Sequence, residues 1–174
     1  SGAVLLPEAS ESCSTVQEHL ELIERRVQHL LDVPEYGGMP GEVASFAKHE
    51  LQPAWKSVKG ECGRGAMNDE MLLRRPLNIA DRILSPSDFG FHNAFQTVHG
   101  PVFFDFEYAG WDDPAKMICD FFCQPEVPVS KTFLPLFENE VTQLFDKKDA
   151  LKKRVSLLFP PYRIKWCCIM LNDF

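Results

Sequence analysis

Asp88, Asn93 and Asp105 are the residues of this chain whose types and spacing best suit chemistry. An acid is followed five residues later by an amide, and a second acid comes at the end of a short apolar run. Phosphoryl transfer needs a group that accepts the proton of the attacking hydroxyl, together with oxygen ligands for magnesium. The sequence therefore predicts phosphoryl transfer, with Asp88 as the base and with Asn93 and Asp105 as Mg²⁺ ligands.

A β-hairpin is expected to bring these three side chains together. Two short extended runs, residues 93–98 and 102–106, are separated by His99 and Gly100, and glycine supplies the positive φ that a tight turn needs. Pairing across this turn would place Asp105 beside residue 93 or 94. Each polar residue taken singly has a structural alternative, because Asp and Asn in turns commonly cap backbone groups.

Helical patterns dominate the first half of the chain. Thr15 and Glu18 form a capping box before an amphipathic helix at about 15–32. A second helix is expected at about 41–57, kinked or shortened by Pro53. The glycine-rich stretch at 60–65 is expected to be a mobile connector, since a phosphate loop would need a strand before it.

The second half is also predicted to be helical. Asp113 and Pro114 provide an N-cap and a first-turn proline for a helix that Pro125 stops. Further helices are expected at about 130–145, 147–158 and 160–172. The fold class is therefore mainly α with one small inserted β-hairpin. We expect a single domain over 1–174, divided into a helical segment (1–80), a catalytic loop with its hairpin (81–112) and a second helical segment (113–174).

Composition narrows the class of partner. A net charge of -7 argues against a nucleic-acid partner and against an anionic membrane surface. No apolar run reaches the roughly 18 residues of a membrane span. The basic run at 147–154 is expected to be a solvated helix face, with a phosphate site as the alternative. Six cysteines without a paired spacing are expected to be reduced thiols, which favours a cytoplasmic protein.

The D-x-x-x-x-N block from Asp88 and the stretch V-F-F-D-F-E-Y-A-G-W-D-D-P from Val102 resemble the aminoglycoside phosphotransferase and choline kinase family. The resemblance is strongest over about 82–124. It implies a protein-kinase-like carboxy-terminal lobe, with ATP or GTP as the donor and Mg²⁺ as the cofactor. The acceptor would be a hydroxyl of a sugar, aminoglycoside or amino alcohol.

The resemblance implies a role for Asp113, and the positions of two further residues, His92 and Glu107, make them candidates for the site. Asp113 matches an acid that braces the catalytic loop in the family. His92 is a candidate for a hydrogen bond to substrate or phosphate, with a structural loop histidine as the alternative, and Glu107 is a candidate to reach the metal through water. The chain departs from the family at Pro86, where the family usually has a histidine that orients the loop.

A second departure lies at the amino end. Only 87 residues precede Asp88 and they read as helices, so the family's small amino-terminal sheet with its nucleotide-gripping lysine has no room. We expect that the lobe was removed, that it is a separate chain, or that the protein binds substrate without ATP. Exposed aromatic surface at its place would favour a dimer partner. The chain alone is expected to bind nucleotide weakly. Two other classes remain open, namely a non-catalytic, pseudokinase-like binding module and a metal-dependent phosphohydrolase.

Overall fold

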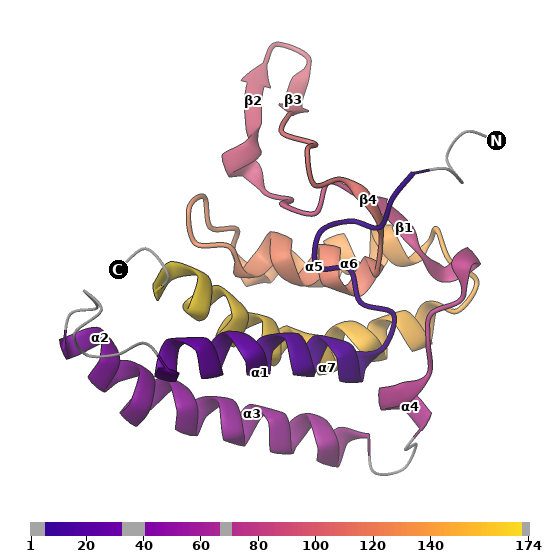
Figure 1. Ribbon diagram of the computed structural model, residues 1–174. Helices are drawn as coiled ribbons and strands as arrows, with labels where there is room; N and C mark the ends of the chain where they lie inside the picture. Colours follow the sequence, from indigo (N-terminus) through magenta and orange to yellow (C-terminus); the bar gives the residue numbers. More distant parts are fainter. Residues whose placement is uncertain (1–5, 33–40, 67–70, 172–174) are drawn as a thin grey trace. The chain divides into compact units, whose positions relative to one another are not determined.

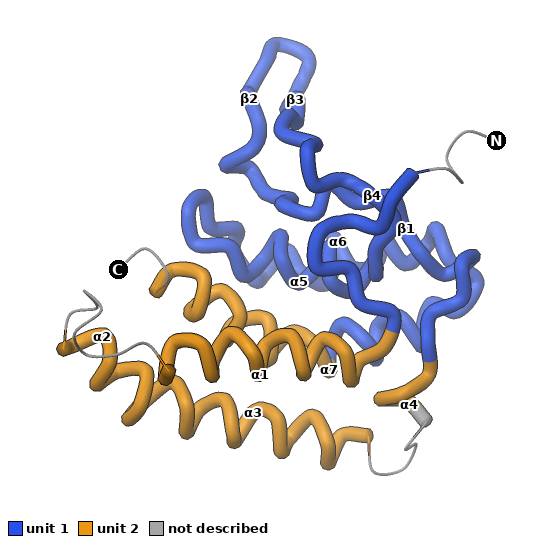
Figure 2. The backbone as a smooth tube through the Cα atoms, viewed as in Figure 1, with its two compact units in different colours: residues 1–14, 76–156 blue, residues 15–75, 157–174 orange. Residues whose placement is uncertain are grey.

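The computed structural model describes residues 6–32, 41–66 and 71–171. Within them the chain is mainly helical, with two small antiparallel sheets of two strands each, which confirms the predicted mainly α class with a small β part (Figure 1). The backbone divides into two compact units, drawn in different colours in Figure 2. Unit 1 contains 1–14 and 76–156, and unit 2 contains 15–75 and 157–174.

All the described elements of unit 2 are helices. Its elements are α1 (Val16–Asp32), α2 (Gly41–Phe46), a π-helical turn (Ala47–Leu51), α3 (Gln52–Gly65), α4 (Met71–Arg74) and the larger part of α7 (Lys148–Leu171). The predicted capping box of α1 is present: the Thr15 hydroxyl accepts from the Glu18 N–H at 3.0 Å, and the Glu18 carboxylate accepts from the Thr15 N–H at 3.2 Å.

The expected connector at 60–65 was wrong, because these residues form the last turns of α3. Pro53 lies at the start of that helix, directly after the π-helical turn, so the helical hydrogen-bond pattern changes at this point but the helix does not end. Trp55 and Cys62 on α3 are buried. A Cβ at Gly65 would come within 3.0 Å of the Leu157 side chain, so this glycine allows a close approach within unit 2. Burial therefore outweighs the low helix propensity of the glycines.

The expected break between two helices at about 158–160 was also wrong. A single helix, α7, continues through Pro160 and Pro161. Prolines inside a helix remove backbone hydrogen bonds and usually kink or break it. Here Leu158, Tyr162 and Cys168 are all buried, and the Tyr162 hydroxyl lies 2.8 Å from Nδ1 of the buried His19. Burial on both sides of the proline pair offsets the lost hydrogen bonds.

Unit 1 holds both sheets and the remaining helices. Its elements are β1 (Ile83–Ser85), β2 (Ala94–Thr97), β3 (Gly100–Phe103), β4 (Gly110–Asp112), α5 (Pro114–Cys123), α6 (Leu134–Thr142), the first turns of α7 and 3₁₀ turns at Ile79–Asp81, Phe91–Asn93 and Lys131–Phe133. The β1–β4 pair was not predicted from the sequence. Strand β2 pairs with β3 in the predicted hairpin, which projects from α5 and α6 in Figure 1.

The hairpin turn differs from the predicted one by one residue. Thr97 pairs with Gly100, so the two turn residues are Val98 and His99, and Gly100 follows them with a φ of +111°. The positive φ assigned to this glycine is confirmed.

The approach of the amino-terminal segment to β4 depends on a second glycine. The N–H of Ala9 donates to the carbonyl of Trp111 at 3.0 Å, and the Trp111 N–H donates to that of Pro7 at 2.9 Å. A Cβ at Gly110 would lie 2.4 Å from the Pro7 carbonyl oxygen, so a side chain there has no room.

All six cysteines are in the thiol form, as expected. Within the described ranges, no helix combines the length and the apolar character that crossing a membrane requires.

Candidate functional site

Asp88 and Asn93 lie together at the start of the hairpin. The Asn93 amide donates both to the Asp88 backbone carbonyl and to its carboxylate Oδ2, each at 3.0 Å. Nε2 of His92 lies 3.1 Å from Oδ1 of the same carboxylate. The Asp88 side chain nevertheless remains 45% exposed, whereas that of His92 is 9% exposed. The carboxylate is therefore oriented by two neighbours and remains accessible to a ligand.

Asp105 follows the second strand of the hairpin. The Phe104 N–H donates to the Asn93 carbonyl at 3.0 Å, which extends the β2–β3 register and brings residue 104, rather than 105, opposite Asn93. The expected register was thus off by one residue. Asp105 is exposed, and no hydrogen bond or ion pair engages its carboxylate among the described residues.

The pKa of Tyr108 is raised by the negative charges around it. A hydrogen bond to Glu107 and the charge of Glu107 raise the pKa of this exposed phenol, and the charges of Asp105 and Asp88 raise it further. A negative charge raises a phenol pKa only when it is close. Asp88, Asp105 and Glu107 therefore contribute to one region of negative potential, which a cation would neutralise.

Backbone strain occurs on both sides of this region. Ser87 has a φ of +71° and Asp105 a φ of +62°, both in the left-handed region. Residues with a Cβ adopt this region at a cost of about 1 kcal/mol or more, and such residues concentrate at functional sites. Ser87 directly precedes Asp88, so the strained turn sets the direction in which the acid leaves the loop.

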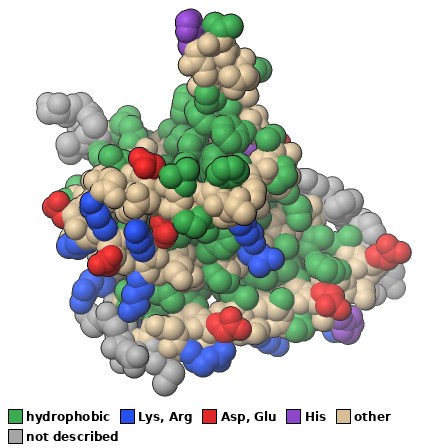
Figure 3. Space-filling view, turned by 180° about the vertical axis from the view of Figure 1, so that it is seen from behind, with side chains coloured by type: hydrophobic (Ala, Val, Ile, Leu, Met, Phe, Trp, Pro, Cys, Tyr) green, Lys and Arg blue, Asp and Glu red, His purple; other side chains and the backbone are tan. Residues whose placement is uncertain are grey.

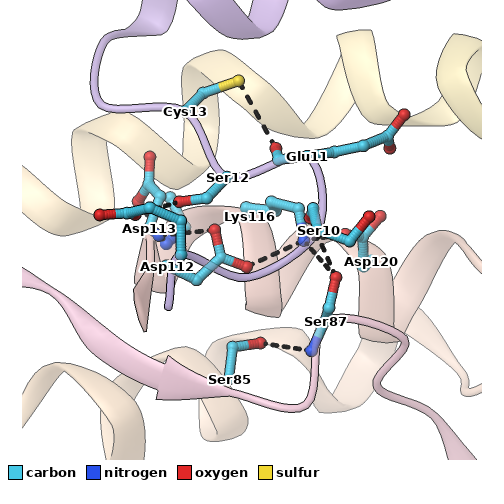
Figure 4. Close-up of polar contacts among 12 residues, drawn as sticks. Ser10, Glu11, Ser12, Cys13, Ser85, Ser87, Asp112, Asp113, Lys116 and Asp120 are labelled. Atoms are coloured by element: carbon cyan, nitrogen blue, oxygen red, sulfur yellow. Dashed lines mark hydrogen bonds and ion pairs between the residues drawn. The ribbon is translucent and has the colours of Figure 1, made fainter. Parts of the chain in front are cut away.

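Hydrogen bonds to both serines hold the strained loop (Figure 4). The Ser87 N–H donates to the Ser85 hydroxyl at 3.0 Å, and the Ser87 hydroxyl donates to the Ser10 carbonyl at 3.0 Å. The ammonium of Lys116 on α5 lies 3.4 Å from the same Ser87 oxygen. Ser85 itself belongs to β1, so the loop is fixed to a sheet, to the amino-terminal segment and to a helix.

Lys116 is the centre of a buried charge cluster. Its Nζ lies 2.8 Å from Oδ2 of Asp112 and 3.3 Å from Oδ2 of Asp120, and all three side chains are at most 2% exposed. Burial alone would lower the pKa of Lys116, but the charges of Asp120 and Asp112 outweigh burial and raise it. The lysine is therefore cationic at neutral pH.

A second buried pair fixes the start of α5. Asp113 accepts the Ala115 N–H at 2.8 Å as the N-cap of this helix, as predicted, and its other oxygen accepts Nε of Arg154 at 2.5 Å. Arg154 also donates to the Ser14 carbonyl at 3.1 Å. The expectation that the basic run is a solvated face was therefore wrong for Arg154, which is 6% exposed. The loop-bracing role of Asp113 stays a prediction, whereas Lys116 bonds the loop directly.

Aromatic rings pack the loop and the hairpin against two helices. Phe89 lies 5.0 Å from both Phe103 and Phe121, measured between ring centroids, and Phe121 stacks on Phe137 at 4.8 Å. Phe91 adds contacts to Phe103 and Phe121. These rings join the loop at 89–91 and β3 to α5 and α6, which keeps Asp88 and Asn93 on a packed base.

Two side chains of this region carry oxygen atoms of the kind that Mg²⁺ prefers. They are the Asp105 carboxylate and the Asn93 amide. Both amide N–H contacts of Asn93 are with Asp88, so its Oδ1 is turned away from that acid. Among the described residues, no three His, Cys, Asp or Glu side chains cluster as metal ligands. A metal here would therefore depend on the amide as well as on the acids.

Comparisons of the chain with models of protein families, with curated proteins and with solved structures found no match.

Proposed function

We propose that the chain is the carboxy-terminal lobe of a small-molecule kinase. It would transfer the γ-phosphoryl group of ATP or GTP to a hydroxyl of a sugar, aminoglycoside or amino alcohol. The observation that carries the proposal is the Asp88–Asn93 pair, in which an accessible carboxylate is oriented by an amide from the start of the neighbouring hairpin. Asp105 leaves the partner strand next to this pair.

Asp88 would accept the proton of the acceptor hydroxyl as the new bond to phosphorus forms. His92 and Asn93 would hold its two oxygens in position. Asn93 and Asp105 would hold Mg²⁺, with Glu107 close enough to interact through water. When bound, the metal would offset the charge that develops on the phosphate oxygens. The negative region around Asp88 and Asp105 would favour a cationic acceptor.

The departure at Pro86 is consistent with this proposal. The family histidine at that position mainly orients the loop, and here Ser85 and Lys116 bond the loop at Ser87. A different set of contacts would therefore orient the loop. The nucleotide-gripping part would come from outside this chain, so that turnover by the chain alone would be slow. Cysteines in the thiol form fit a reducing compartment, and we propose a cytoplasmic location.

A phosphorylation assay with a matched variant tests the proposal. The chain is incubated with radiolabelled ATP or GTP, Mg²⁺ and a panel of sugars, aminoglycosides and amino alcohols, and labelled products are separated. We expect a magnesium-dependent product from at least one acceptor class. In Asn93→Ala, the magnesium concentration for half-maximal turnover should rise about 10–100-fold, by analogy with the loss of other metal-site contacts.

Two results would contradict the kinase assignment. Release of phosphate from simple esters without nucleotide would indicate a phosphohydrolase. No nucleotide binding and no product from any acceptor, when the chain is supplied together with the nucleotide-gripping part that the proposal requires, would indicate a binding module.

A further inference from the structure

The outer edge of β2 is open and carries no charge. No Lys, Arg, Asp or Glu occurs from residue 89 to residue 104, a stretch that includes the whole hairpin. Natural proteins usually protect an exposed strand edge with charges, proline or a covering element. The other edge of this hairpin has such protection, because Pro101 on β3 has no N–H to donate. The β2 strand has neither charges nor proline, and no described element pairs with its outer edge.

The register shows which backbone groups face outward from β2. Phe104 donates to the Asn93 carbonyl, and hydrogen-bonded pairs alternate along an antiparallel ladder. Phe95 and Thr97 therefore bond inward to β3. The N–H and C=O groups of Ala94 and Gln96 face away from β3, and they are available for another strand.

One face of the hairpin is also apolar and exposed. We call Phe95, Val102 and Phe104 the hairpin face: Phe95 and Val102 are cross-strand partners, and the Phe95 and Phe104 rings stack at 4.6 Å. Phe95 is 66% exposed, Val102 54% and Phe104 36%. Hydrophobic side chains cover much of the hairpin below its tip in Figure 3. The opposite face is different, because Phe103 packs on Phe89 and Phe91.

We propose that two copies of this chain associate through antiparallel pairing of β2 with β2 about a two-fold axis. Centred on Phe95, this pairing places Ala94 of each copy opposite Gln96 of the other, and their outward groups form both hydrogen bonds of each pair. The two β2–β3 hairpins become one four-stranded sheet. The hairpin faces of both copies then form one continuous aromatic surface, with Phe95 opposite Phe95.

Charge and pairing geometry favour a second copy as the occupant. Each copy has a net charge of -7, which would oppose association elsewhere, but the pairing surface is uncharged. The pairing buries mainly backbone edges and the two Phe95 rings, which is less than the roughly 800 Å² per partner of a typical stable interface. The dimer is therefore expected to be weak and reversible.

Sedimentation equilibrium of the 174-residue chain tests the association. Wild type should show a monomer–dimer equilibrium, and Gln96→Pro should weaken it at least tenfold, because proline removes an outward N–H without touching the β2–β3 ladder. Phe95→Lys should weaken it similarly by placing two like charges opposite each other. Circular dichroism checks that both variants keep their helices.

Cysteine crosslinking tests the register. Phe95→Cys should form a disulfide-linked dimer on mild oxidation, because directly opposite Cβ atoms lie about 4.5–5.5 Å apart. Val102→Cys should not, because two β3 strands would be separated by about 14 Å across the sheet. The oxidised wild type accounts for the native cysteines. A chain that is monomeric at all concentrations, a dimer insensitive to Gln96→Pro and Phe95→Lys, or equal crosslinking of both cysteine variants would overturn the proposal.

Discussion

Asp88→Ala is expected to reduce phosphoryl transfer by about 10³-fold or more, because it removes both the proton acceptor and the group that positions the hydroxyl. The loss should be in kcat, with little change in KM for the nucleotide, since the base acts on the reacting hydroxyl in the transition state. The unfolding free energy should change little, because the Asp88 side chain is 45% exposed. Turnover and urea denaturation are measured on the same preparation.

Asp81→Asn is the matched control for this experiment. Asp81 is an acid of the same unit that pairs with Lys147 at 2.8 Å, away from the residues proposed to react. Its turnover should stay within about twofold of wild type, because the effect of a surface ion pair is small. Near wild-type turnover in Asp88→Ala would rule out this residue as the base.

Lys116→Met is expected to produce the largest loss of stability. Methionine has a similar length but leaves Asp112 and Asp120 buried without their cation. Breaking a buried ion pair in this way costs about 3–5 kcal/mol, a large part of the roughly 5–15 kcal/mol that stabilises a typical domain. Lys147→Met, which removes an exposed pair with Asp81, should cost at most about 1 kcal/mol. Urea denaturation at neutral pH measures both.

The pH dependence distinguishes charge from packing in this variant. Burial raises the pKa of Asp112, and without Lys116 little opposes that effect. An acid whose folded-state pKa is raised destabilises the fold progressively as pH rises above its unfolded value of about 4. The loss of unfolding free energy in Lys116→Met, relative to wild type, should therefore be smaller at pH 5 than at pH 8. In wild type the pKa of Lys116 is raised, so the charged lysine continues to stabilise the fold until strongly alkaline pH.

A triple variant tests whether the unpaired buried acids cause this loss of stability. Adding Asp112→Asn and Asp120→Asn to Lys116→Met removes the uncompensated charges, so part of the lost stability should return. A deficit independent of pH, with no recovery in the triple variant, would mean that packing rather than charge stabilises this cluster.

Local signals accounted for much of the predicted fold. The Thr15–Glu18 capping box and the Asp113–Pro114 start of α5 involve residues within three positions of each other, and the structure confirms both. The hairpin was predicted from two short runs and a glycine, although its turn was misplaced by one residue.

The errors came from packing that no local pattern contains. The glycines of α3 and the prolines of α7 both lie in helices because buried neighbours such as Trp55 and Leu158 stabilise them. Arg154 reaches Asp113 across 41 residues of sequence, so nothing in the basic run distinguishes it from its solvated neighbours.

The buried Lys116 cluster was missed although the sequence contains a signal for it. Lys116 and Asp120 are four residues apart on α5, and this spacing on a helix brings opposite charges together; Asp112 lies four residues before Lys116, at the end of β4. The helix also carries Met117, Ile118 and Phe121, and this apolar setting indicates burial of its charged residues. The loop contact from Lys116 to Ser87 could not be foreseen, because it joins residues 29 positions apart.

Metal binding at the hairpin tests the central claim most directly. NMR spectra of the isotope-labelled chain with ATP are recorded during titration with Mn²⁺, a paramagnetic substitute for Mg²⁺. We expect selective broadening of amide signals around Asp88, Asn93 and Asp105 at low Mn²⁺ concentrations, and loss of this selectivity in Asp105→Asn. Uniform broadening across the chain, or an unchanged pattern in Asp105→Asn, would contradict the convergence of these side chains on one divalent ion.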